Sequence, residues 1–352
     1  MEFKSLFKNY REEIKKRIYE TLDEKEKDYK SRLNTDIDVF EILKNFSTKG
    51  KMLRGSLFLF SAESYRKKID ENLLNIAVSL EMMHSALLIH DDIMDNDSLR
   101  RGEKTIFSKY KDYAKATGIK NPEHYGISMG IVVGDIALFI AEELAVNSDK
   151  NSLQEMLKFY TQELRFVGIG QLLDFSYGAQ DTEFSADDIR RMYIDKSARY
   201  SFTLPLCLGA ISAGVAGIEI KSIEQLGEKM GLIFQLIDDD LGMFGNEDEI
   251  GKPVGSDVRE NKKTFMRSLL MQKADEALKN ELNLIFGNQN ISIAELEKVR
   301  SSILDLGVRD KIQEEINGLY NEANEKINNL NISNDYKRIF IALLDYNAKR
   351  TF

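Results

Sequence analysis

Three aspartates stand at the end of an apolar stretch, at a spacing that could hold a divalent cation. Residues 80–102 read LEMMHSALLIHDDIMDNDSLRRG, where apolar residues recur at helical intervals and lead to Asp91, Asp92 and Asp95. On a helix Asp91 and Asp95 lie one turn apart on the same side, so their charges repel. A cation between them would remove this repulsion. All-oxygen ligation suits Mg²⁺, which takes one or two carboxylates and fills its other positions with water and phosphate oxygens.

A second run of aspartates favours a metal site over a solvated acidic helix end. Residues 234–242 read FQLIDDDLG, so Asp238, Asp239 and Asp240 follow an apolar run, where packing does not explain them. Gln235 stands three and four positions before Asp238 and Asp239 and shares their helical side. Taken alone, the first motif would more often be the solvated acidic end of a helix than a metal site. The second motif, and the basic pair that follows the first, reverse that preference.

Basic residues accompany the first motif in two places. Arg100 and Arg101 follow it directly, and Lys51 and Arg54 lie in the segment GKMLRG (50–55) at the expected start of a helix. Cations at a helix start, beside a glycine that permits close approach, suit an anion site. His84 lies seven residues before the first aspartate and shares its helical side. His84 could either contact an anion or be a buried core histidine whose hydrogen bonds are satisfied, and the sequence leaves both alternatives open.

Two further segments carry groups that could reach a phosphate. Gln171 and Asp174 lie three apart in GQLLD (170–174) and share a helical face, while Lys196 and Ser197 offer a cation and a hydroxyl.

Residues 245–263 form a polar, glycine-containing stretch. It contains Lys252, Lys262 and Lys263, and we expect it to act as a lid that closes over a bound anion.

The elements that must position these residues are predicted to be helices throughout. The chain has 352 residues, 43% of them hydrophobic, and only three prolines, with helical periodicity over long segments. No linker or low-complexity tract divides it, so we expect one all-α domain over 1–352. Motifs occupy about 40–265, and amphipathic helices fill 266–352. We expect an apolar helix at 126–146, a loop from 102 to 122 and a buried helix at 201–218.

Charge and composition exclude several classes of function. The net charge of −9, with both signs mixed along the chain, disfavours nucleic acid as a partner. The single cysteine, Cys207, excludes an intramolecular disulfide. The N-terminal stretch is charged throughout and lacks the apolar core of a signal peptide. Residues 201–218 are short for a bilayer, which needs ~20 apolar residues. We therefore expect a cytoplasmic protein without stable membrane insertion.

The ordered set of motifs resembles the trans-isoprenyl diphosphate synthases, most closely the archaeal-type geranylgeranyl and farnesyl diphosphate synthases. The matching segments are GKMLRG (50–55), HDDIMDNDSLRRG (90–102), GD (134–135), GQLLD (170–174), KS (196–197), FQLIDDDLG (234–242) and GKPVGSDVRENKKT (251–264). The resemblance implies a single helical bundle around a central cavity, the isoprenoid synthase type I fold. It further implies a homodimer in which two acidic helices face each other across the cavity mouth.

The resemblance also assigns roles to individual residues. It implies three Mg²⁺ ions, with Mn²⁺ as an alternative, bound by Asp91, Asp95, Asp174 and Asp238. It implies isopentenyl diphosphate contacts from Lys51, Arg54, His84 and Arg101. Allylic diphosphate contacts are implied for Arg100, Gln171, Lys196, Ser197, Gln235, Lys252 and Lys262. The catalytic set it implies is Asp91, Asp92, Asp95, Lys196, Asp238 and Asp239.

Three positions depart from the family pattern. Met52 replaces a basic residue, Ser197 replaces a threonine but keeps the hydroxyl, and Gly242 stands where many members have the last aspartate of the second motif. Archaeal-type enzymes often have glycine at that place, so we expect activity.

The residues fit a reaction in which an allylic diphosphate ionises. Mg²⁺, lysine and arginine neutralise the leaving group, and the double bond of isopentenyl diphosphate attacks the resulting cation. The departing diphosphate is the family's proposed proton acceptor, and an apolar cavity excludes water.

Product length is expected to depend on the floor of that cavity. The family implies positions 86 and 87 for this floor, although helical periodicity alone would select Leu87 and not Ala86. A small Ala86 leaves room, and Met83 one turn deeper could be the stop. We expect a C20 product, with C15 or C25 as neighbouring outcomes.

Other functions fit less well. A class I terpene cyclase carries a second motif ending in glutamate, where this chain has Asn246. An HD-type phosphohydrolase, suggested by His90 before the first aspartate, needs more than the three histidines present. A non-catalytic subunit of a heteromeric synthase usually loses the acidic motifs, and both are present here.

Overall fold

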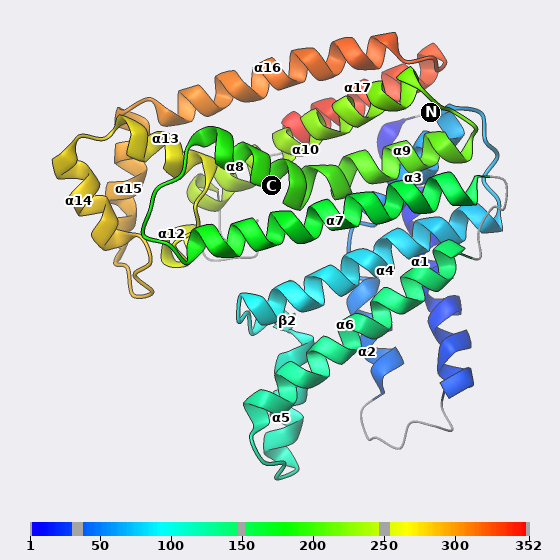
Figure 1. Cartoon of the computed structure of the whole chain (residues 1–352), viewed down its shortest axis with the longest axis horizontal. Coiled ribbons are helices and arrows are strands. Elements are labelled where there is room, and N and C mark those ends of the chain that lie inside the picture. Colours follow the sequence, from blue (N-terminus) through cyan, green and yellow to red (C-terminus); the bar gives the residue numbers. More distant parts are fainter. Residues whose placement is uncertain (1, 30–37, 147–151, 246–253, 350–352) are drawn as a thin grey trace. The chain divides into compact units, whose positions relative to one another are not determined.

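The computed structural model describes residues 2–29, 38–146, 152–245 and 254–349 (Figure 1). Two compact units divide the chain: unit 1 comprises Met1–Leu157 with Leu208–Gly214, and unit 2 comprises Lys158–Cys207 with Val215–Phe352. Helices dominate both units, and the strands within the described residues form one short hairpin. The all-α fold class is therefore confirmed. The expectation of one domain over 1–352 stays a prediction, and we describe each unit by itself.

Unit 1 is built on a pair of long helices that pack side by side (Figure 1). Its elements are α1 (Phe3–Tyr29), α2 (Val39–Ser47), α3 (Leu53–Ser64), α4 (Glu71–Met94), β1 (Leu99–Arg100), β2 (Glu103–Lys104), α5 (Ile106–Ala116) and α6 (Pro122–Val146). Helix α4 packs against α6 on one side and α3 on another, and Asp70 caps its start by accepting from Leu73 N at 2.9 Å. Helix α4 is long and apolar enough to cross a membrane, but 67% of its most apolar window is buried in the protein, as in a core helix.

Two expectations about the connecting segments need correction. The loop expected from 102 to 122 contains helix α5, whose buried Ile106, Phe107, Tyr110 and Ala114 lie on one helical face. Charged residues between these positions concealed the periodicity. The helix expected at 201–218 is buried but ends at Ser212, because Gly214 has a positive φ of 83° and breaks it.

Unit 2 is organised around the second acidic helix. Its elements are most of α7 (Leu153–Gly178), α8 (Ala186–Tyr193), the π-helix η1 (Ile194–Thr203), the start of α9 (Leu204–Ser212), α10 (Ile218–Phe244), α12 (Ser256–Arg259), α13 (Phe265–Lys273), α14 (Glu276–Ile285), α15 (Ile293–Asp305), α16 (Val308–Asn329) and α17 (Asn334–Ala348). Helix α10 packs against η1, α16 and α17. The amphipathic helices expected after residue 266 are thus confirmed as α13–α17.

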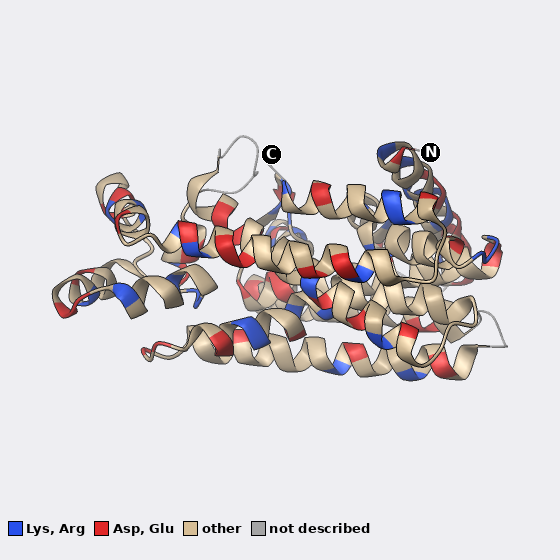
Figure 2. Ribbon diagram, turned by 90° about the horizontal axis from the view of Figure 1, so that it is seen from above, with Lys and Arg blue, Asp and Glu red and all other residues tan. Residues whose placement is uncertain are grey.

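Acidic and basic residues are interspersed along the helices, as the sequence indicated (Figure 2). Several of them join neighbouring helices within unit 2. Arg199 of η1, for example, binds the buried Glu163 of α7 at 2.6 and 2.8 Å and also reaches Glu224 of α10 at 3.2 Å. These ion pairs fix η1 between α7 and α10.

Candidate active site

The first acidic motif occupies the last turn of α4. Asp95 is the C-cap residue, and its backbone N–H donates to the carbonyl oxygen of Asp91 at 2.9 Å. The predicted one-turn spacing is therefore confirmed. Negative side chains at a helix C-terminus add to the negative end of the helix dipole, which is unfavourable without a cation. Asp91 is a quarter exposed and Asp95 is exposed, so both carboxylates are accessible.

Asp92 differs from Asp91 and Asp95 because it is buried, with 1% exposure. Arg100 donates from Nε to Oδ1 of Asp92, and its Nη2 lies 3.4 Å from Oδ2 of Asp91. Burial raises the pKa of Asp92 to about 6, and the Arg100 guanidinium opposes that rise. Asp92 thus holds Arg100 against the motif, while its role as a catalytic group stays a prediction.

A tight hairpin directs the two arginines. Strands β1 and β2 pair Arg100 with Glu103 across a two-residue turn, in which Arg101 and Gly102 have φ values of 54° and 75°. Positive φ at both central residues matches the type I′ turn that suits the twist of a hairpin. Arg100 binds the aspartates, whereas the guanidinium of Arg101 lies 3.5 Å from where a Cβ on Gly50 would stand.

The four residues implied for isopentenyl diphosphate all belong to unit 1, and three of them come together. Burial first, and then the charges of Arg54 and Arg101, lower the pKa of His84 well below its usual value, so the imidazole is neutral. Lys51 is exposed just before α3. Met52, the N-cap residue of α3, has a left-handed backbone conformation and is 1% exposed, so its apolar side chain is buried where the family pattern has a basic residue.

Sequence reasoning missed a buried glutamate beside this cluster. Glu81 of α4 is 3% exposed and accepts a hydrogen bond from Gly55 N at 2.8 Å. The signal was available, because a charged residue on an apolar helix face needs a partner when it is buried.

The second acidic motif lies at the end of α10, where its three aspartates have different environments. Asp238 is exposed, and Asp240 binds Arg309 through two hydrogen bonds of 2.8 and 2.9 Å. Asp239 is 8% exposed and accepts from Tyr193 Oη and from Gln235 Nε2, the latter at 3.0 Å. Burial, together with nearby acidic charges, raises the pKa of Asp239 well above its usual value.

Gln235 was expected to contact substrate, and in this structure it holds Asp239. The Tyr193 hydroxyl also accepts from Phe265 N at 3.1 Å. This contact joins α8, α10 and α13 at one buried point. The assignment of Asp239 and Gln235 to catalysis and substrate binding stays a prediction.

Asp257 lies beside Gly242, the position at which many family members have the last aspartate of the second motif. A Cβ on Gly242 would stand 3.6 Å from Oδ2 of Asp257, which belongs to the short helix α12. The backbone N–H of Gly255 donates to the carbonyl oxygen of Gly242 at 3.0 Å and holds α12 there. Lys262 lies 3.9 Å from Asp257 and 2.8 Å from Glu260. Sequence reasoning missed Asp257 because only the fold brings it to α10.

Helices α7 and η1 bring Asp174 and Lys196 together. Lys196 Nζ donates to Oδ2 of Asp174, and both side chains are partly buried. Gln171 lies one turn before Asp174 on α7, and Ser197 follows Lys196 on η1. The pairing of Asp174 with Lys196 was not predicted, and the roles assigned to these four residues stay predictions.

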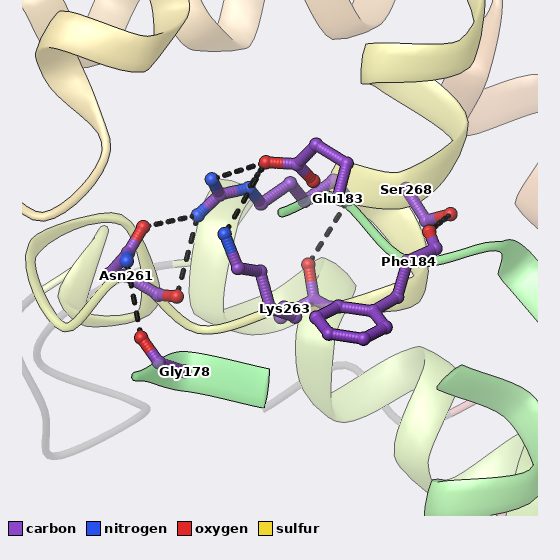
Figure 3. A network of polar contacts seen from close by, with 8 residues as sticks. Gly178, Glu183, Phe184, Asn261, Lys263 and Ser268 are labelled. Atoms are coloured by element: carbon purple, nitrogen blue, oxygen red, sulfur yellow. Dashed lines mark hydrogen bonds and ion pairs between the residues drawn. The ribbon is translucent and has the colours of Figure 1, made fainter. Parts of the chain in front are cut away.

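The described half of the expected lid is fastened to unit 2 (Figure 3). Lys263, whose side chain is 2% exposed, and Arg267 of α13 both bind the carboxylate of Glu183. Asn261 accepts from Arg267 at 2.7 Å and donates to the carbonyl oxygen of Gly178 at 3.3 Å. Residues 254–263 are thus anchored to the α7–α8 connection. Lys252 lies outside the described residues, so its predicted role is not addressed.

The residues implied for product length lie on α4. Met83 and Ala86 are each 2% exposed, and Leu87 is partly exposed one turn before Asp91. His90 turns to α6, where its Nε2 lies 3.5 Å from Asp135. This contact accounts for the histidine without an HD-type metal site.

Mg²⁺ fits the donor chemistry of these residues. Within the described residues, no three carboxylate, imidazole or thiol groups converge closely enough to hold a metal ion by themselves. Asp91 and Asp95 belong to unit 1, and Asp174 and Asp238 to unit 2. An all-oxygen set with few protein ligands is what Mg²⁺ uses when substrate phosphates complete its shell. The predicted ligand set stays a prediction.

Comparison with known proteins agrees with these motifs. The family model for polyprenyl synthetase matches residues 39–303. The chain is 30% identical over 262 residues to the geranylgeranyl diphosphate synthase of Saccharolobus solfataricus, which covers 73% of this chain and 74% of that protein. It is 29% identical over 285 residues to the short chain isoprenyl diphosphate synthase of Methanocaldococcus jannaschii, which covers 80% of each chain.

A solved structure extends the likeness to the whole fold. The geranylgeranyl pyrophosphate synthase from Corynebacterium glutamicum, crystallised with isoprenyl diphosphate and magnesium, superposes with a TM-score of 0.90. Its sequence is 27% identical, and the match covers 97% of this chain and 98% of that one. The predicted family is therefore confirmed, and this chain belongs to the polyprenyl synthetase family.

Proposed function

We propose that the chain is a short-chain trans-prenyltransferase that condenses isopentenyl diphosphate with dimethylallyl, geranyl and farnesyl diphosphates. One observation carries this proposal most directly. Consecutive residues of one hairpin make different contacts: Arg100 binds Asp91 and Asp92, whereas the guanidinium of Arg101 lies beside Gly50. Two adjacent arginines with different neighbours suit an enzyme that binds two diphosphate substrates, whereas a terpene cyclase binds one.

The side chains divide the chemistry between the two substrates. Bound Mg²⁺ would neutralise the charge that develops on the allylic leaving group, and Asp91, Asp95, Asp174 and Asp238 would hold it. Arg100 and Lys196 would add positive charge to the same leaving diphosphate. As the carbon–oxygen bond breaks, the double bond of isopentenyl diphosphate attacks the allylic carbon, and the departing diphosphate takes the released proton.

The second substrate would be held by cationic and neutral donors of unit 1. Lys51, Arg54 and Arg101 supply the charge that isopentenyl diphosphate needs. Burial and the charges of the two arginines lower the pKa of His84, and the neutral ring that this favours can donate one hydrogen bond.

We propose geranylgeranyl diphosphate, C20, as the main product, in agreement with the names of the synthases from Saccharolobus solfataricus and Corynebacterium glutamicum. Ala86→Phe tests the expected floor, with product chains measured by chromatography and folding checked by thermal denaturation. A shift to C15 is expected. An unchanged product distribution in folded protein would show that Ala86 does not set the product length.

We further propose that the enzyme is a cytoplasmic homodimer. Helix α6 exposes Val132, Phe139 and Val146, with Phe139 62% exposed, and these positions repeat every seven residues along one face. Tyr29, Phe40 and Phe139 line an apolar hollow beside them. Apolar surface of this kind marks an interaction site. Phe139→Glu is expected to shift the mass measured by sedimentation from that of a dimer to that of a monomer. A variant that stays a dimer would show that this face of α6 is not the interface.

One assay tests the function as a whole. Purified protein is incubated with isopentenyl diphosphate, each allylic diphosphate in turn, and either Mg²⁺ or Mn²⁺. Elongated prenyl diphosphate is expected. No incorporation by the protein alone would favour a non-catalytic subunit, and cyclic hydrocarbon from one substrate would favour a terpene cyclase.

A further inference from the structure

Glu81 is a buried carboxylate that the proposed reaction does not use. It lies in the middle of α4, among the buried residues Leu80, Met82 and Met83, and is 3% exposed. Burying an ionised carboxylate costs several kcal/mol unless hydrogen bonds and opposite charges compensate it. The contacts of Glu81 therefore indicate why this helix carries it.

Those contacts are the backbone donors at the start of α3. Helix α3 begins at Leu53, and Met52 at its N-cap makes no capping hydrogen bond with its side chain. The first N–H groups of a helix need acceptors, and the second and third are the ones a capping side chain usually serves. Glu81 accepts from both: from Gly55 N at 2.8 Å and from the backbone N–H of Arg54. The cap of α3 thus comes from α4.

Close packing of the two helices makes this cap possible. A Cβ on Gly55 would lie 2.8 Å from the carbonyl oxygen of Ala77, which is one turn before Glu81 on α4. Any larger residue at position 55 would push α3 away from the carboxylate. The last glycine of the GKMLRG segment therefore has a geometric role.

Two positive charges surround the same carboxylate. Burial raises the pKa of Glu81, and the charges of Arg54 on α3 and of Arg101 on the hairpin oppose that rise. These are the two arginines assigned to isopentenyl diphosphate. Glu81 is thus bonded to the backbone of one of them and attracts the charges of both.

We infer that Glu81 is the positioning residue of the isopentenyl diphosphate site, where it fixes the start of α3 and with it Arg54. This inference rests on the proposed function. Glu81 is not a catalytic residue, because its carboxylate is buried and directed at the α3 backbone. Its loss should therefore weaken the binding of one substrate and leave the ionisation of the other unchanged.

The test compares Glu81→Gln and Glu81→Ala with the wild-type enzyme. Glutamine keeps one acceptor oxygen but loses the charge, and alanine loses both. We expect KM for isopentenyl diphosphate to rise about tenfold in Glu81→Gln, the effect of one charge-assisted hydrogen bond, and further in Glu81→Ala. KM for the allylic diphosphate and kcat should each change less than about twofold.

Glu163→Gln is the matched control, because Glu163 is also a fully buried glutamate paired with an arginine, Arg199, but in unit 2. It should lower the melting temperature and leave KM for isopentenyl diphosphate unchanged, because its partner Arg199 belongs to η1, which carries none of the residues assigned to that substrate. An unchanged KM for isopentenyl diphosphate in Glu81→Gln would overturn the inference, and so would an equal rise in both KM values. If the Glu81 variants do not fold, Gly55→Ala must give the same selective rise.

Direct binding keeps the inference separate from the proposed function. Calorimetric titration of wild-type protein with isopentenyl diphosphate needs no turnover. Wild-type protein that neither binds this compound nor elongates an allylic diphosphate would refute the function. Wild-type protein that does both, beside a Glu81→Ala variant that binds equally tightly, would refute only the role of Glu81.

Discussion

The two acidic motifs share a pattern of burial but differ in what holds the buried member. In each, one aspartate of an adjacent pair is accessible (Asp91, Asp238) and the next is buried (Asp92, Asp239). Asp92 binds a cation, Arg100, whereas Asp239 binds the neutral Tyr193 and Gln235. In each motif, therefore, the first aspartate of the adjacent pair is a candidate metal ligand and the second is a structural anchor. The anchor of the first motif brings a positive charge to the site, and that of the second does not.

The largest effects should come from the accessible member of each pair. Asp91→Ala and Asp238→Ala should each lower kcat/KM about 10³-fold, because they remove carboxylates that would hold Mg²⁺ at the leaving group. Steady-state kinetics at saturating Mg²⁺ measures this. Asp305→Ala, at an exposed aspartate of α15, is the control and should keep full activity. Near-normal rates in either motif variant would contradict the assignment.

The next largest difference between the two motifs should come from the third aspartate of each. Asp95 is exposed at the end of α4, whereas Asp240 is bound by Arg309. Asp95→Asn should lower kcat/KM about 10²-fold, while Asp240→Asn should stay within about twofold. Equal losses in the two variants, measured in the same assay, would show that the second motif also uses its third carboxylate.

The buried anchors should affect stability more than rate. Tyr193→Phe leaves one buried oxygen of Asp239 without its donor and should lower the free energy of unfolding by about 2 kcal/mol. Urea denaturation measures this change. Tyr320→Phe removes a hydroxyl that binds Asp345 at 2.6 Å at a more exposed place, and should cost about 0.5 kcal/mol. An equally small loss in Tyr193→Phe would mean that the buried contact is not an anchor.

The smallest effect should come from restoring the missing carboxylate of the second motif. Gly242→Asp places a negative charge beside Asp257, so the variant should be less stable without Mg²⁺ by about 0.5 kcal/mol. Added Mg²⁺ should raise its melting temperature more than that of the wild type. Gly242→Ala fills the same space without charge and should stabilise α10 by up to about 1 kcal/mol. A Mg²⁺ response identical to that of Gly242→Ala would argue against a cation at this place.

The sequence predicted the helical fold and the local geometry of each motif, because both depend on residues close together in the chain. The spacing of Asp91 and Asp95, the apolar face of α4 and the amphipathic C-terminal helices are of this kind. The pairing of Asp174 with Lys196, which lie on different helices, was not predicted.

Contacts that depend on tertiary packing were not predicted. Glu81 caps a helix to which it does not belong, and Asp257 reaches Gly242 only because α12 folds back onto α10. Neither contact leaves a periodic signal in the chain. Helix α5 was missed for a different reason, since lysines and an aspartate stand between its apolar positions in the sequence.

The turn at Arg101 and Gly102 has a consequence for successive rounds of elongation. Consecutive Cα atoms are about 3.8 Å apart, so the origins of the two guanidinium groups are tied to each other by a single peptide unit. In the proposed reaction the heads of both substrates would bind side chains of adjacent residues, whatever the length of the growing tail. Chain length would then be decided at the far end of the tail, with no readjustment where the bonds change.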